Sequence, residues 1–88
     1  MTTDPPVFDN RAKGRFELER NGQVAVLVYE RHPDSLVFVH TEVPPELRGQ
    51  HLGDVLARAG LKAAHDEGLR VVVVCPFVRA YLQRHPQS

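Results

Sequence analysis

The strongest constraint on the fold is a strand–helix–strand pattern between residues 36 and 75. Segments 36–43 (LVFVHTEV) and 70–75 (RVVVVC) are rich in β-branched and apolar residues, as strands are. An apolar stripe with helical spacing separates them: Leu52, Val55, Leu56, Ala59 and Ala63. This stripe predicts a helix from about 49–51 to 67, and hence two parallel strands joined by one right-handed β-α-β crossover. The continuous apolar run 70–75 further predicts a strand buried on both faces.

The segments before this unit predict two more strands. Residues 15–20 alternate apolar with charged, Asn21-Gly22 is a strong hairpin signal, and residues 23–30 return as a β-branched strand. Segment 36–43 then runs antiparallel to 23–30, and Pro76 begins a final helix. The expected order is strand-strand-strand-helix-strand-helix, an α/β (α+β) fold with a mixed, mostly antiparallel sheet. We expect residues 1–10 to be a flexible lead-in without regular structure, and 11–88 to form a single domain.

Composition narrows the class of protein. Eleven Lys and Arg balance eleven Asp and Glu, which argues against nucleic acid as the main partner. One cysteine, Cys75, excludes an internal disulfide and favours a reducing, cytoplasmic location. The longest apolar run, 69–77, is interrupted and far short of the ~20 residues that a membrane span needs. The histidines lack metal-ligand spacing, so we expect no metal site.

The stretch ELRGQHLGDVL, residues 46–56, places Arg48 and two glycines where a polar loop becomes the long helix. A helix start carries four unpaired N–H groups and about half a positive charge, and glycines let an anion approach them. This pattern predicts a phosphate site. It is neither a Walker loop nor a dinucleotide fingerprint, because the required endings and spacing are absent. The alternative is an ordinary loop and helix cap.

Several blocks between residues 40 and 86 together carry a resemblance. HTEV, then RGQHLG, a helix, an apolar strand, CPFV, a tyrosine and His-Pro follow one another in this order. The chain thereby resembles the GNAT superfamily of acetyl-CoA-dependent N-acetyltransferases, and more narrowly its very small single-domain members. The resemblance implies a minimal GNAT-like fold and acetyl-CoA as cofactor. Its motif-bearing part covers a little over half of the chain.

The resemblance also implies a coenzyme A site. The third strand, which ends at Val43, would hold the pantetheine arm through its backbone, and the third and fourth strands would splay to admit it. The arginine-glycine loop would wrap the pyrophosphate: Arg48, Gly49, Gln50, His51, Leu52 and Gly53. His51 departs from the pattern, which usually has glycine there. A side chain at this position would crowd the phosphates, demand a backbone shape that glycine adopts more easily, or donate a hydrogen bond to the phosphates.

Four residues are candidates for the chemistry. Strand alternation places His40 and Glu42 on one face together with Leu36 and Phe38, so Glu42 is a candidate base and His40 its support. The alternative is that Glu42 pairs with an arginine and His40 only packs. Cys75 precedes the Pro76 helix start and would lie across the splay from His40 and Glu42.

The resemblance makes Cys75 a candidate acyl acceptor or substrate-site residue. The alternative is a small buried hydrophobe. Tyr81 lies where larger acetyltransferases place a tyrosine that protonates the departing thiolate, and the alternative is a core aromatic.

The sequence therefore predicts an acetyl-CoA-binding N-acetyltransferase that acts on an amine acceptor, either directly or through a cysteine. Two alternatives stay open: a non-catalytic acyl-CoA-binding or sensing module, and a protein-interaction domain that retains the fold. The acceptor, whether small molecule or protein, and the choice between monomer and homodimer are not determined by the sequence.

Overall fold

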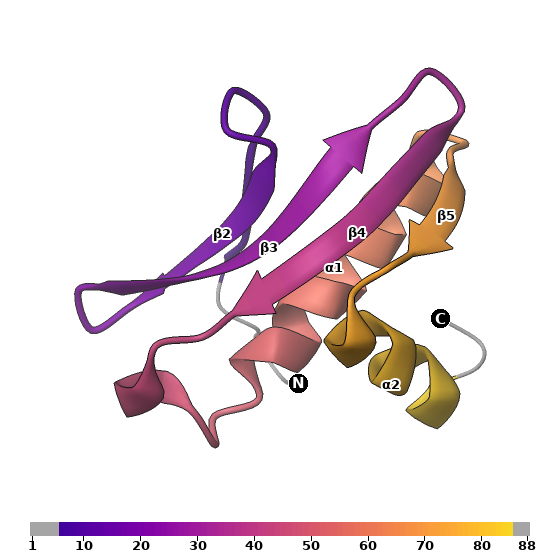
Figure 1. Cartoon of the computed structure of the whole chain (residues 1–88). Helices are drawn as coiled ribbons and strands as arrows, with labels where there is room; N and C mark the ends of the chain where they lie inside the picture. Colours follow the sequence, from indigo (N-terminus) through magenta and orange to yellow (C-terminus); the bar gives the residue numbers. More distant parts are fainter. Residues whose placement is uncertain (1–5, 86–88) are drawn as a thin grey trace.

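A computed structural model of the chain describes residues 6–85, which form one mixed sheet with two α-helices packed against it (Figure 1). The elements follow in this order: β1 (Phe8–Asn10), β2 (Arg15–Arg20), β3 (Gln23–Arg31), β4 (Ser35–Glu42), the 3-10 turn η1 (Pro45–Leu47), α1 (Leu52–Asp66), β5 (Arg70–Val73) and α2 (Pro76–Arg84). Within these residues the sheet order is β1-β2-β3-β4-β5, antiparallel except for the parallel pair β4 and β5.

The predicted architecture is confirmed. The β-α-β crossover runs from β4 through α1 to β5, and the two strands are parallel, with Leu36 opposite Val71 and Phe38 opposite Val73. The Asn21-Gly22 hairpin joins β2 to β3, and both of its central residues have the positive φ that such a turn needs.

Strand β1 falls inside the segment for which the sequence predicted no regular structure, so that expectation is wrong for residues 8–10. Its residues pair antiparallel with β2, with Phe8 opposite Glu17 and Asn10 opposite Arg15. Pro6 precedes the strand and does not interrupt it. A three-residue edge strand leaves too short a pattern for periodicity to reveal, and residues 1–5 lie outside the described part of the chain.

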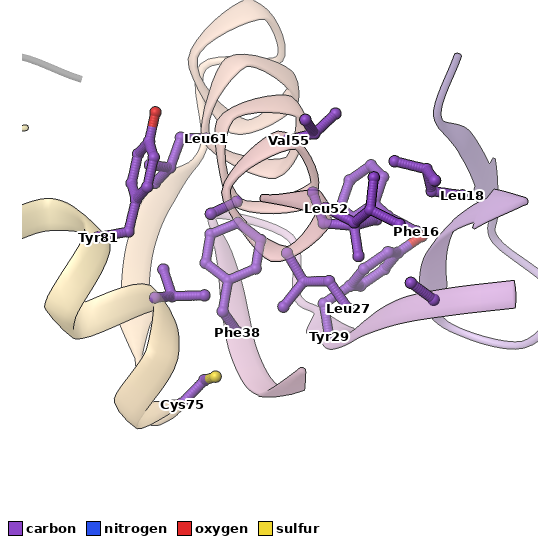
Figure 2. Close-up of a cluster of buried hydrophobic side chains, with 14 of the residues drawn as sticks. Phe16, Leu18, Leu27, Tyr29, Phe38, Leu52, Val55, Leu61, Cys75 and Tyr81 are labelled. Atoms are coloured by element: carbon purple, nitrogen blue, oxygen red, sulfur yellow. The ribbon is translucent and has the colours of Figure 1, made fainter. Parts of the chain in front are cut away.

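The core lies between one face of the sheet and the two helices (Figure 2). The strands contribute Phe16, Leu18, Leu27, Tyr29 and Phe38, all buried. From the helix side, α1 supplies Leu52 and Leu56 and α2 supplies Val78, again buried. Gly60 of α1 faces the Phe38 ring: a Cβ there would lie 2.7 Å from Phe38 Cε1. This contact explains why a helix interior holds a glycine.

The opposite face of the sheet carries no helix within residues 6–85. Along β5 and the residue after it, Val72 and Val74 are 40% and 55% exposed. The prediction of a strand buried on both faces is therefore wrong. The physical reason is that β5 is an edge strand, and both helices pack on the same side of the sheet.

A bulge in β4 changes which way its last residues point. Tyr29 lies opposite Phe38 and Val28 opposite His40, so Val39 is an extra residue on β4. After the bulge, Thr41 lies opposite the core residue Leu27 and therefore shares its face. The alternation predicted from the sequence is thus correct up to Phe38 and reversed beyond it.

Strands β4 and β5 separate after the bulge. Their pairing ends at Phe38 and Val73, where the N–H groups of Val74 and Cys75 both donate to the Phe38 carbonyl at 2.9 Å. Strand β4 continues to Glu42, while the chain after β5 turns into α2. The pairing therefore ends where the splay was predicted, and the splay itself stays a prediction.

Candidate functional site

A cavity of about 590 Å³ opens where β4 ends. It lies between the last residues of β4, the segment that leads to α1, the start of α1 and one side of α2. Its lining comprises His40, Thr41, Glu42, Val43, Leu47, Arg48, Gly49, His51, Leu52, Gly53, Asp54, Phe77 and Arg84. The structure thus brings most of the predicted loop residues and the predicted β4 pair to one hollow.

The loop before α1 has two residues in the left-handed region of backbone conformation, Gly49 and His51. Gly49 has φ 86° and faces open space, so nothing covers the backbone on the side where a Cβ would stand. His51 precedes the helix in the left-handed region, with φ 61° and ψ 25°, and makes no side-chain capping hydrogen bond. The N–H groups of the first turn, at Leu52 to Asp54, have no carbonyl partner within the helix. These three residues line the cavity.

The backbone of His51 explains why its position ordinarily suits glycine. A left-handed conformation is strained for most side chains, and this chain accepts it at a histidine. The imidazole is exposed, and its Nδ1 lies 3.8 Å from Asp54 Oδ2. It therefore stands at the cavity rim beside the helix start.

Two arginines border the cavity. Arg48 Nε donates to the Val43 carbonyl at 3.4 Å, which ties the loop to the end of β4. Arg84, on α2, donates to both carboxylate oxygens of Asp54 on α1. The predicted loop residue Gln50 does not line the cavity, and its amide oxygen instead accepts a hydrogen bond from Arg20 of β2 at 3.2 Å.

Gly53 permits close packing of α2 on the start of α1. A Cβ at this position would lie 2.6 Å from Phe77 Cζ. The Phe77 ring, 39% exposed, covers the first turn of α1 and forms one wall of the cavity. Gly53 thereby has a packing role in addition to its predicted place in the phosphate loop.

The predicted pair His40 and Glu42 does share a face, and His40 Nε2 lies 3.6 Å from Glu42 Oε2. That face is the open side of the sheet, because the two residues lie opposite Val28 and Val26, which alternate with the core residues of β3. The expectation that they point to the same side as Phe38 is wrong, and the bulge at Val39 is the reason. Both side chains are exposed, and both residues are among those that line the cavity.

Cys75 occupies a different environment. It is buried, immediately precedes α2, and its Sγ lies 3.2 Å from Thr41 Oγ1. Thr41 lines the cavity on the core side of β4, so Cys75 stands behind it. The expectation that Cys75 faces His40 and Glu42 across the splay is therefore wrong, because those two side chains point to the other face.

Tyr81 is not brought to the cavity. It is buried in the core, and its ring centroid lies 4.5 Å from that of His85. Figure 2 shows its hydroxyl directed away from Cys75. The structure therefore separates the four candidate catalytic residues into an exposed pair on β4 and two buried side chains.

Asp54, Phe77 and Arg84 line the cavity but were not found by sequence reasoning. Asp54 falls within the expected long helix and Phe77 within the expected final helix, and neither residue carried a separate signal in the sequence. Arg84 lies 30 residues from Asp54, so no local pattern connects the two.

Two features are absent from residues 6–85. No group of three His, Cys, Asp or Glu side chains there is arranged to hold a metal ion. No helix in this part of the chain is long and apolar enough to cross a membrane.

Comparison with known proteins adds independent findings. Residues 15–88 match the family model described as GCN5-related N-acetyl-transferase. The chain is similar to the protein NATD1 of Bos taurus, with 34% identity over 91% of this chain and 74% of the relative. It is likewise 32% identical to NATD1 of Homo sapiens, over 91% of this chain and 74% of that protein. The match therefore extends well beyond the loop that forms the cavity.

Proposed function

Because the chain belongs to the GCN5-related N-acetyltransferase family, we propose that it binds acetyl-CoA in the cavity at the end of β4 and transfers the acetyl group to an amine. The observation that carries the proposal is the arrangement around residues 48–53. There, unpaired first-turn N–H groups, an uncovered Gly49 and two arginines border a cavity of about 590 Å³. These are donors suited to a diphosphate.

The residues present fit acetyl-CoA as a co-substrate. Arg48 and the N–H groups of residues 49–53 would hold the diphosphate, and the backbone edge of β4 beyond Phe38 would hold the pantetheine arm. This edge has no strand partner on the β5 side, because the pairing ends at Val73. When bound, acetyl-CoA supplies an activated acyl group as a thioester.

Acetyl transfer requires that the attacking amine lose a proton. The amine nitrogen forms a bond to the acetyl carbon, the bond from that carbon to sulfur breaks, and the proton passes to a base. Glu42, supported by His40 at 3.6 Å, is the base that the geometry favours, either directly or through a water molecule. Both side chains are on the open face of the sheet, from which an acceptor can approach.

The positions of Cys75 and Tyr81 favour direct transfer. Cys75 is buried behind Thr41 and hydrogen-bonded to it. An acyl group could therefore reach the Cys75 sulfur only if Thr41 moved. Tyr81 contributes to the core and does not line the cavity. The same observations support a second candidate, a non-catalytic acyl-CoA-binding module that keeps the phosphate loop without chemistry.

The proposal is tested by thermal denaturation with and without acetyl-CoA. A ligand at about 100 times its Kd stabilises a protein by about 2.7 kcal/mol, which corresponds to a rise in Tm of roughly 10–20 °C in a domain of this size. Arg48→Glu should abolish the increase, because it places a carboxylate beside the diphosphate. Arg70→Glu, on the exposed start of β5 away from the cavity, is the matched control and should keep it.

Catalysis is tested separately by thiol release from acetyl-CoA in the presence of a panel of amines. Glu42→Gln should lower the rate and leave binding of acetyl-CoA unchanged, whereas Cys75→Ala should retain the rate if transfer is direct. Binding without thiol release for any amine would support the non-catalytic module. Absence of a Tm increase at millimolar acetyl-CoA would contradict both candidates.

A further inference from the structure

We propose that Arg84 is a phosphate-binding residue of this cavity and that Asp54 holds it in position. The proposal rests on the proposed binding of coenzyme A and adds to it a residue from α2, outside the loop that the family pattern identifies. It assigns a role to an ion pair that joins the end of one helix to the start of another.

The pair has a defined geometry. Arg84 Nη2 donates to Asp54 Oδ1 at 3.0 Å, and Nη1 donates to Oδ2 at 3.5 Å. The two residues are the last residue of α2 and the third residue of α1, and both side chains line the cavity. A forked contact of this kind fixes the plane of the guanidinium as well as its location.

The guanidinium keeps capacity for a ligand. Its five N–H donors exceed the two contacts with Asp54. The Arg84 side chain is 53% exposed, while that of Asp54 is 18% exposed, so the carboxylate is the more enclosed partner. The remaining donors belong to a half-exposed side chain of a residue that lines the cavity.

The location of Asp54 explains why the arrangement suits an anion. Asp54 belongs to the first turn of α1, whose N–H groups have no partner within the helix. The carboxylate therefore brings a fixed cation beside the same donors that would bind a diphosphate. The Asp54 carboxylate also lies 3.8 Å from His51 Nδ1.

A purely structural role explains the pair less well. An ion pair with a half-exposed partner contributes little to folding stability. Besides two histidines, the charged residues that line the cavity are two arginines and two carboxylates: Arg48, Arg84, Glu42 and Asp54. Without Arg84, the arginine and carboxylate charges would give the lining a net negative charge. A diphosphate would then meet a repulsive cavity.

The experiment measures the Kd of coenzyme A by calorimetry for the wild type, Arg84→Gln and Arg84→Lys, together with the Tm of each protein without ligand. Arg84→Gln should weaken binding by about ten-fold to a hundred-fold, the range expected for the loss of a charged hydrogen bond. Arg84→Lys keeps the charge and loses the fork, so its Kd should fall between the two. The control is Arg79→Gln on the same helix. Arg79 Nη2 donates to the Val73 carbonyl, and Arg79 does not line the cavity.

Three outcomes overturn the inference. The first is a Kd for Arg84→Gln within two-fold of the wild type. The second is an equal weakening by Arg79→Gln. The third is a decrease in ligand-free Tm for both Arg84 variants that is large enough to account for their loss of affinity. The ion pair would then contribute to folding stability alone. If the wild type binds coenzyme A and Arg84→Gln binds equally well, only this inference fails, whereas absence of wild-type binding overturns the proposed function with it.

Discussion

Gly60→Ala in the middle of α1 should destabilise the protein, although alanine is the better helix former. In an exposed helix the change would stabilise by about 1 kcal/mol. Here the new Cβ would lie 2.7 Å from Phe38 Cε1 and 3.1 Å from Leu27 Cδ2, and both side chains are fully buried. Overpacking of a core costs about 1–3 kcal/mol. The two effects leave a net loss of about 1 kcal/mol in the free energy of unfolding.

Urea denaturation followed by circular dichroism measures this loss, and thermal denaturation should show a decrease in Tm of about 4–8 °C. Ala59→Gly, the neighbouring position on the same helix, is a control for helix propensity alone. A second control is Gly60→Ala in a Phe38→Leu background, which removes the ring atoms that the Cβ meets. In that background, alanine should be better tolerated than in the wild type, which reveals the coupling between the two positions.

The reasoning would be refuted if Gly60→Ala raised the free energy of unfolding by the full ~1 kcal/mol of helix propensity. Such a result would mean that α1 does not approach the sheet as closely as the structure describes. It would equally be refuted if the substitution had the same effect with and without the Phe38 ring.

Two further predictions concern the cavity and the opposite end of the sheet. Gly53→Ala should displace the Phe77 ring, because its Cζ would lie 2.6 Å from the new Cβ. Since that ring is partly exposed and lines the cavity, we expect a weaker affinity for coenzyme A in calorimetry with only a small decrease in Tm. An unchanged Kd would contradict this prediction. Burial, and then the hydrogen bond to Asp9, raise the pKa of the Tyr29 phenol above its ordinary value of 10.0. Its contribution to stability is thus fully present below about pH 10 and is lost as the pH rises through the folded-state pKa, so Tyr29→Phe should flatten the decline of Tm in alkaline buffers.

Much of the fold was predictable because its signals are local. The alternation in 15–20, the Asn-Gly turn and the apolar stripe of α1 each depend on residues close in sequence, and each matches the observed element. The one parallel pair followed from the length of the helix between β4 and β5. The three-residue strand β1 was missed because it is too short to show a period.

The site was predictable in part. The glycine-arginine loop was located by its composition at a helix start, and the structure places it on the cavity. The side of the sheet on which His40 and Glu42 lie was not predictable from the sequence. The bulge at Val39 depends on the pairing between β3 and β4 and leaves no mark on the local pattern. Likewise, Cys75 contacts Thr41, 34 residues away, and only their packing could reveal that the thiol lies behind the wall of the cavity.

The sequence by itself determined the order of strands β2 to β5 and of the two helices, the single crossover and the position of the glycine-arginine loop. These properties follow from side-chain periodicity and backbone preference, which act over a few residues. The tertiary structure alone decided which face the end of β4 presents, that one side of the sheet stays uncovered, and that Arg84 meets Asp54 at the cavity. Those properties depend on how distant segments pack, since each of them is fixed by contacts between elements that lie far apart along the chain.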